Sequence, residues 1–182
     1  YLKELPELAW KFFETKGIQN GIPVTQTGYG VIYNKEIFEA AGITELPQTY
    51  EEWGLVCDQL VKKDIVPWIN GTETTGGPSL AYWLGSNGTS MIDTAGKADY
   101  GNKACMEVWS FYDGNIKNAY QPKNVLQYTE EEAKQLLLDG KAAMYSGGIP
   151  NFIPEDTRKY GVLPMLSGTE AKGISYHPIS FQ

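Results

Sequence analysis

Apolar side chains recur at the spacing of a helix face in several stretches of this sequence, and short apolar segments separate these stretches. The clearest stripe has an i, i+3, i+4, i+7, i+8 spacing and consists of Trp53, Val56, Cys57, Leu60 and Val61. The segments between the stripes are short enough to be buried strands and cover residues 31–33, 65–69, 142–145 and 160–166. Helices that alternate with short strands predict an α/β fold, with the helices packed on a mixed sheet.

Two successive helices carry clear start and stop signals. Asn34 has the properties of an N-cap, and Gly42 is placed to end the short helix that follows. Pro47 prevents this helix from continuing, and Thr49 with Glu52 forms a capping box that starts the next helix. This pattern builds structure and supplies no ligand-binding group by itself.

Further helices are predicted from other start signals. One covers residues 5–13, and others begin at Pro78, after Asn102 and after a second capping box at Thr129. The first of these helices and the tail over residues 167–182 have few obvious partners within the chain. We therefore expect the two ends to be the least supported parts of the fold.

The charge and the cysteines exclude several classes of site. The chain has 182 residues and a formal net charge of −7, from 22 acidic and 15 basic side chains. With a single arginine, Arg158, and no basic stripe, nucleic-acid binding is not expected. Two cysteines without metal-ligand spacing and one histidine, His177, predict no metal site and no cofactor. Cys57 and Cys105 lie on predicted apolar helix faces, which favours buried thiols, although a disulfide remains the alternative.

Catalytic motifs are poorly represented, so we do not expect an enzyme. The sequence has no Gly-x-Ser-x-Gly elbow, and His177 lies beside a proline near the end of the chain. Gly28-x-Gly30 lacks the third glycine and the context of a dinucleotide site. Most acidic residues lie at predicted helix starts, where negative charge is favourable. A hydrolase with a hidden pair of carboxylates is the alternative.

Aromatic residues make up 13% of the chain, and several flank loops rich in glycine and threonine. Such rings can lie against the C–H faces of a sugar, while neutral polar side chains bind its hydroxyls. The alternative is that most rings are core residues, which we expect for Trp53 and Trp109 because both lie in helical stripes. The rings near loops are Tyr29, Tyr33, Trp68, Tyr82, Trp83, Tyr145 and Phe152.

Three pieces of the sequence resemble one known family in order and distance. The longest covers residues 33–43 and 47–53, with Tyr-Asn-Lys-Glu-Ile-Phe-Glu-Ala-Ala-Gly-Ile followed by Pro-x-Thr-Tyr-Glu-Glu-Trp. The others are Gly-Lys-Ala-Ala-Met over residues 140–144 and Tyr-Gly-Val-Leu-Pro over residues 160–164. Together they resemble the family 1 extracellular solute-binding proteins, the sugar-capturing subunits of ABC importers. The resemblance spans roughly residues 17–175.

This resemblance implies a periplasmic-binding-protein-like fold of two α/β lobes joined by a hinge, with the ligand clamped between them. Mapped on this chain, residues 1–24 would hold the end of the first lobe and the start of a hinge crossing. Residues 25–158 would form the second lobe, and residues 159–182 the returning hinge strand and another fragment of the first lobe. Most of the first lobe would then lie outside this chain.

The resemblance also implies partners and ligand-binding residues. We expect a monomer, held at the cell surface as a lipoprotein or free in the periplasm, that delivers a carbohydrate to a membrane permease. A peptide or a polyamine is the alternative ligand. The stretch over residues 146–152 lacks the tryptophan that often stacks on the sugar in this family. The predicted ligand-binding residues are Tyr29, Asn70, Glu73, Gly77, Ser79, Trp83, Gly148 and Phe152.

Overall fold

The computed structural model of this chain describes residues 7–11, 13–71, 78–93, 95–148, 157–164, 166–168 and 176–181, without the side chains of residues 8, 9, 23–28, 78, 79, 157 and 176–181. The helices are α1 (Glu7–Lys11), α2 (Lys35–Ala41), α3 (Tyr50–Val61), α5 (Pro78–Ser86), α6 (Lys103–Lys117) and α7 (Glu130–Leu138), with 3-10 turns η2 (Val125–Gln127) and η4 (Thr157–Lys159). The strands are β1 (Glu14–Thr15), β2 (Ile18–Gln19), β3 (Ile22–Asn34), β4 (Val66–Asn70), β5 (Ala142–Gly148), β6 (Tyr160–Val162) and β7 (Tyr176–Phe181).

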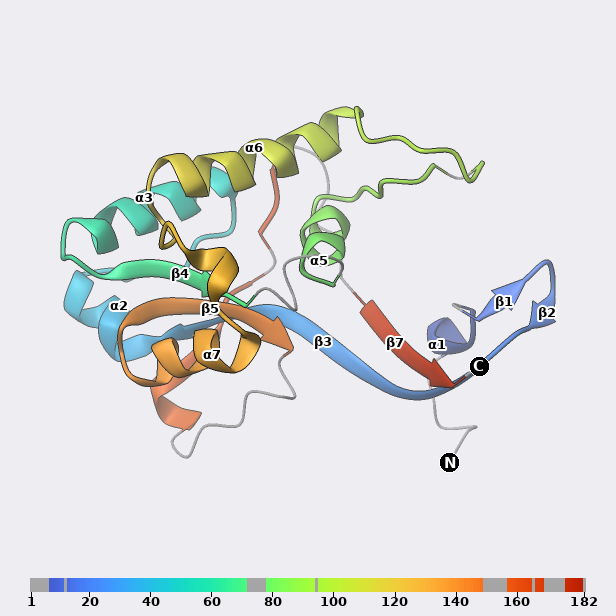
Figure 1. The fold of residues 1–182 in the computed structure, drawn as a ribbon, viewed down its shortest axis with the longest axis horizontal. Coiled ribbons are helices and arrows are strands. Elements are labelled where there is room, and N and C mark those ends of the chain that lie inside the picture. The colour runs from blue at the N-terminus through green and yellow to red at the C-terminus, as the bar shows by residue number, and fades with distance from the viewer. Residues whose placement is uncertain are drawn as a thin grey trace.

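Strand β3 connects two parts of the molecule, a body of helices packed on a sheet and a smaller group formed by α1, β1, β2 and β7 (Figure 1). In the body the strand order is β4-β5-β3-β6, with β4 parallel to β5 and the other neighbouring pairs antiparallel. Residues 22–28 of β3 extend beyond this sheet and pair antiparallel with β7. The predicted α/β fold with a mixed sheet is confirmed.

Apolar side chains cover both faces of the main sheet. On one face, α3, α5 and α6 bury a group of rings that includes Trp53, Trp68, Trp83 and Phe111. The Trp68 ring lies edge-on to those of Trp53 and Trp83, with centroids 5.5 and 5.9 Å apart. The next residue of β4, Ile69, points to the opposite face, where α7 packs. Because successive side chains of β4 point to opposite faces of the sheet, this strand contributes to the cores on both faces.

The helix boundaries follow the predicted local signals. Asn34 Oδ1 accepts hydrogen bonds from two backbone N–H groups of the first turn of α2, and Gly42 ends this helix with a φ of 77°. The capping boxes at Thr49 and Thr129 both form, each with its reciprocal pair of bonds. These predictions are confirmed. They could be made from the sequence because each cap is formed by residues that are close in sequence.

Three predictions about element ends are wrong. The tail does have a partner in the chain, because β7 pairs with β3, and α1 also contacts β3. The strand expected over residues 160–166 stops at Val162. Leu163 N still donates a hydrogen bond to Val31 O, but the chain then leaves β3, and Ser167 pairs with Thr49. Val61 does not share the buried stripe of α3: it is the last residue of the helix, and 42% of its surface is exposed.

The cysteines are two buried free thiols, Cys57 and Cys105, as their positions on helix faces predicted. Burial raises the pKa of the Cys57 thiol above its ordinary value, so the group stays protonated. None of the helices in the described residues is long and apolar enough to cross a membrane.

Candidate functional site

The sheet register brings three of the predicted ligand-binding residues to one edge of the main sheet. Asn70 is the last residue of β4 and lies opposite Ser146 of the parallel strand β5. Two residues further along β5, Gly148 lies opposite Tyr29 of β3. In open α/β sheets, ligands bind outside the carboxyl ends of parallel strands. This edge, formed by Tyr29, Asn70 and residues 146–148, is therefore the candidate site.

Asn70 has an unused hydrogen-bonding group at this edge. Its side-chain oxygen accepts a 2.5 Å hydrogen bond from Nε2 of Gln121, and both side chains are buried. Its Nδ2, also buried, has no hydrogen-bond partner in the described part of the structure. A buried donor without an acceptor costs about 1–3 kcal/mol. Such a donor is typical of a site that another group completes.

An aromatic row borders the site on the side of α5. The Tyr29 ring is half-buried, and its centroid lies 6.3 Å from that of Tyr82. Tyr82 in turn lies edge-on to Trp83, with centroids 5.1 Å apart. Because Tyr82 and Trp83 are almost fully buried, Tyr29 is the ring of this row that retains an accessible surface.

Two glycines at this edge occupy positions where a side chain would not fit. The Tyr145 hydroxyl donates a 2.8 Å hydrogen bond to Oε1 of Glu130, the first residue of α7. A Cβ atom at Gly147 would overlap the Tyr145 ring, and a Cβ atom at Gly71 would overlap the backbone of Glu130. Gly71, the residue directly after β4, therefore lies closely packed against the start of α7.

The described side chains at this edge are mostly uncharged at neutral pH. Burial raises the pKa of Tyr82 to about 12. Burial, together with the bond donated to Glu130, raises the pKa of Tyr145 above its ordinary value. The described residues contain no group of three or more His, Cys, Asp or Glu side chains that could hold a metal ion. This chemistry suits a neutral polar ligand.

The other predicted ligand-binding residues have different outcomes. Trp83 is fully buried in the core between α3, α5 and α6, so its ring is packed against protein and is not presented to a ligand. We therefore remove Trp83 from the candidate site. Ser79 lies in the first turn of α5, where the backbone alone is described. Glu73, Gly77 and Phe152 lie outside the described residues.

Gln121 is a site residue that the sequence did not reveal. It follows Tyr120, whose carbonyl oxygen accepts a 3.0 Å hydrogen bond from the backbone N–H of Trp68 in β4. This contact places residues 120–121 beside the strand that ends at Asn70. No local motif marks Gln121, because its position depends on a pairing across some 50 residues, from 70 to 121.

Comparison with known proteins identifies the family of this chain. A family model for bacterial extracellular solute-binding proteins matches residues 3–181. The chain belongs to this family. A curated binding protein of Brucella abortus (strain 2308) is 26% identical in an alignment 184 positions long, which covers 92% of this chain and 44% of the relative.

Solved structures of the same fold cover nearly the whole chain. A sugar transporter of Arthrobacter chlorophenolicus A6 with bound laminaribiose has a TM-score of 0.79 and 19% identity, over 97% of this chain and 47% of that one. Maltose-bound MalE3 of T. maritima also has a TM-score of 0.79 and 19% identity, over 98% and 49%. This solute-binding chain thus has a periplasmic-binding-protein fold, and it spans about half the length of the proteins it matches.

Proposed function

We propose that this solute-binding chain is part of the substrate-binding component of an ABC importer, which captures a neutral carbohydrate between two hinged lobes. The convergence of Tyr29, Asn70 and Gly148 at the carboxyl edge of the main sheet carries this proposal. The sugars bound to structurally similar proteins, laminaribiose and maltose, support the ligand class.

The proposed contacts bind the sugar by two kinds of interaction, stacking and hydrogen bonding. The accessible face of Tyr29 would lie against the C–H surface of a sugar ring. The unpaired N–H of Asn70 would donate to a sugar hydroxyl. Glu73, Gly77, Ser79, Gly148 and Phe152 remain proposed contacts from the adjoining segments. A micromolar ligand requires about −8 kcal/mol in total from these interactions.

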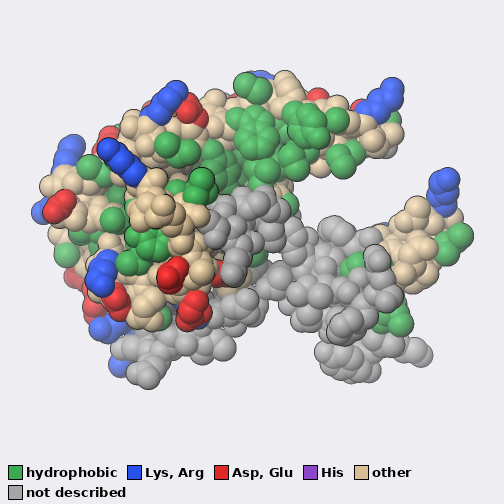
Figure 2. Space-filling model, viewed as in Figure 1, with side chains coloured by type: hydrophobic (Ala, Val, Ile, Leu, Met, Phe, Trp, Pro, Cys, Tyr) green, Lys and Arg blue, Asp and Glu red, His purple; other side chains and the backbone are tan. Residues whose placement is uncertain are grey.

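The long strand supports a hinged arrangement. Residues 22–28 of β3 leave the main sheet accompanied by β7, which makes a two-stranded link to the smaller group. Figure 2 shows the molecule hollowed between the segment that joins α5 to α6 and the β1–β2 hairpin. We propose that residues 25–158 form one lobe, and that residues 1–24 and 159–182 belong to the hinge and the other lobe. Ligand would then favour the closed form, which docks on a permease outside the cytoplasmic membrane.

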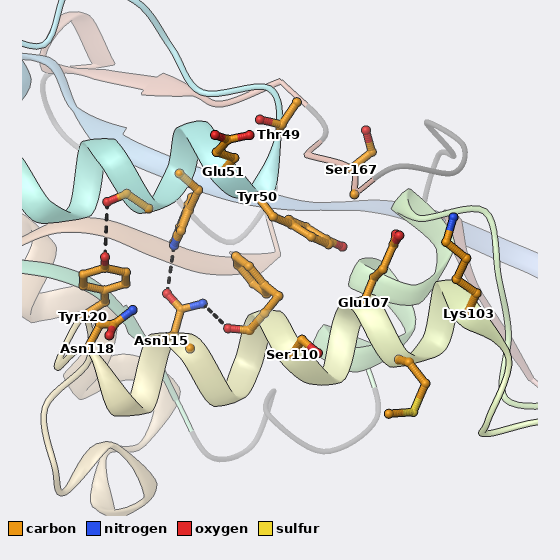
Figure 3. A pocket seen from close by; sticks show the side chains of 16 residues that line it. Thr49, Tyr50, Glu51, Lys103, Glu107, Ser110, Asn115, Asn118, Tyr120 and Ser167 are labelled. Carbon is orange, nitrogen blue, oxygen red and sulfur yellow. Dashed lines mark hydrogen bonds between the residues drawn. The ribbon is translucent and has the colours of Figure 1, made fainter.

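A polyamine or peptide ligand, and a hydrolase, have less support. A polyamine needs several carboxylates that converge with rings, whereas the described acid at this edge, Glu130, already accepts the Tyr145 hydroxyl. A hydrolase needs a pair of carboxylates that act together in one pocket. Glu51 and Glu107 line one pocket between α3 and α6 (Figure 3), but none of Tyr29, Asn70 and Gly148 lines it. We therefore keep the sugar-binding proposal and treat the others as outcomes of the test.

A thermal-shift screen of the full-length protein tests this function. We expect at least one neutral di- or oligosaccharide to raise the melting temperature, because a ligand at 100 times its Kd stabilises the folded state by about 2.7 kcal/mol. Spermidine, a short peptide and a sugar phosphate are the comparison ligands. A shift produced by these compounds, with none from the neutral sugars, would contradict the proposal.

A further inference from the structure

Two side chains at the candidate site have oxygen atoms that already accept hydrogen bonds from buried donors. Asn70 Oδ1 accepts the 2.5 Å bond from Gln121 Nε2, and Ser146 Oγ accepts a 2.7 Å bond from Trp68 Nε1. All four residues are buried, and the most exposed of them, Gln121, has 7% of its surface accessible. Because both oxygens are engaged within the protein, the groups that remain for a ligand are the N–H of Asn70 and the O–H of Ser146.

These two donors lie on the face of the sheet that also carries Tyr29. Asn70 pairs with Ser146 across the parallel strands β4 and β5, so the two side chains point to the same face, about 4.8 Å apart along the sheet. Tyr29 pairs with Gly148, two residues after Ser146, and therefore belongs to this face as well. One sugar ring can thus contact Tyr29 and both donors.

The buried partners determine which atom each side chain offers to a ligand. An indole N–H can only donate, so Ser146 is the acceptor toward Trp68 and its own hydrogen is directed elsewhere. Gln121 is placed beside β4 because the carbonyl of the preceding Tyr120 accepts a 3.0 Å bond from Trp68 N. Within the described part of the chain, no group accepts a hydrogen bond from Ser146 Oγ or from Asn70 Nδ2.

We propose that Gln121 and Trp68 are positioning residues that make this edge of the site a pair of hydrogen-bond donors. The ligand then presents acceptor oxygens here, from a hydroxyl or an ether of the sugar, and a group that can only donate is rejected. This inference rests on the proposed function and narrows its ligand class: neutral sugars bind, whereas sugars with an ammonium group at this position do not. The reason is that a donor facing donors leaves buried N–H and O–H groups unpaired.

Calorimetry of the full-length parent protein with sugar analogues tests the donor character of the edge. The probe is the neutral sugar with the largest thermal shift, together with analogues in which one hydroxyl at a time becomes fluorine or a protonated amino group. Fluorine can only accept a hydrogen bond, and the ammonium can only donate. At one hydroxyl at least, we expect the fluoro analogue to bind about tenfold or more tightly than the amino analogue, about 1.4 kcal/mol. Amino analogues that bind as well as fluoro analogues at every position would overturn the inference.

Gln121→Met tests whether Gln121 sets this preference. Without its partner, the Asn70 amide can turn and offer its oxygen to an ammonium. We therefore expect the ratio of fluoro to amino affinity at that hydroxyl to fall about threefold or more, the loss of a modest hydrogen bond. Gln127→Met, at an exposed position, is the control and should keep the parent ratio.

The remaining outcomes separate this inference from the proposed function. An unchanged ratio in Gln121→Met, even with weaker binding of every analogue, would show that Gln121 only supports the fold, and would overturn its positioning role. If the parent protein binds a neutral sugar without any preference for fluorine over ammonium, the inference fails and the proposed function stands. If the parent binds no neutral sugar, both fail. The analogue series on the parent protein needs no variant, so a Gln121→Met protein that does not fold leaves the donor edge testable.

Discussion

Trp68→Ala is expected to lower the free energy of unfolding by about 3–5 kcal/mol, the range for removing a fully buried tryptophan. The ring lies at the centre of the aromatic core, edge-on to Trp53 and Trp83. Its Nε1 also donates a 2.7 Å hydrogen bond to Ser146 Oγ, so the substitution leaves a buried hydroxyl without this donor. Because Ser146 belongs to the candidate site, the loss should loosen the site as well.

Urea unfolding measures this loss, with Trp109→Ala as the matched control. Trp109 is half-buried at the edge of the same core, and its Nε1 makes a longer bond of 3.4 Å to the Tyr100 carbonyl. We expect its removal to cost clearly less than that of Trp68. Equal costs would mean that the centre of the core is not where the structure places it.

Gly71→Ala is expected to destabilise the protein by about 3 kcal/mol, at the upper end of the overpacking range. The added methyl group would overlap the Glu130 backbone, which cannot rotate away as a side chain can. Gly71 would have to move away from the start of α7, and the neighbouring Asn70 would move with it. We therefore expect weaker ligand binding in any Gly71→Ala protein that still folds.

The matched control is Gly101→Ala, at an exposed position where an added Cβ meets no atom within 4 Å. Its unfolding free energy should stay within about 0.5 kcal/mol of the parent protein. Comparable losses for Gly71→Ala and Gly101→Ala would show that close approach to α7 does not constrain Gly71.

The helix boundaries could be predicted from the sequence because their signals are local. Asn34 and Gly42 delimit α2 within a few residues, and the capping boxes at Thr49 and Thr129 each join residues three apart. The apolar stripe of α3 likewise identified its buried face, apart from the terminal Val61.

Features that depend on long-range pairing could not be predicted. The register between β3 and β7 joins residues more than 140 positions apart in sequence, and no motif marks it. In α5, apolar and aromatic residues lie on several sides of the helix, so the sequence did not indicate that Trp83 is buried and not presented to a ligand.

The most direct measurement of the central claim is a calorimetric titration of full-length Tyr29→Ala with the neutral sugar that stabilises the parent protein most. Tyr128→Ala is the matched control, since Tyr128 is a half-buried tyrosine on the opposite face of the sheet. The account predicts at least tenfold weaker binding for Tyr29→Ala, about 1.4 kcal/mol, and parent affinity for Tyr128→Ala. Parent affinity in Tyr29→Ala would contradict the placement of the sugar at this edge of the sheet.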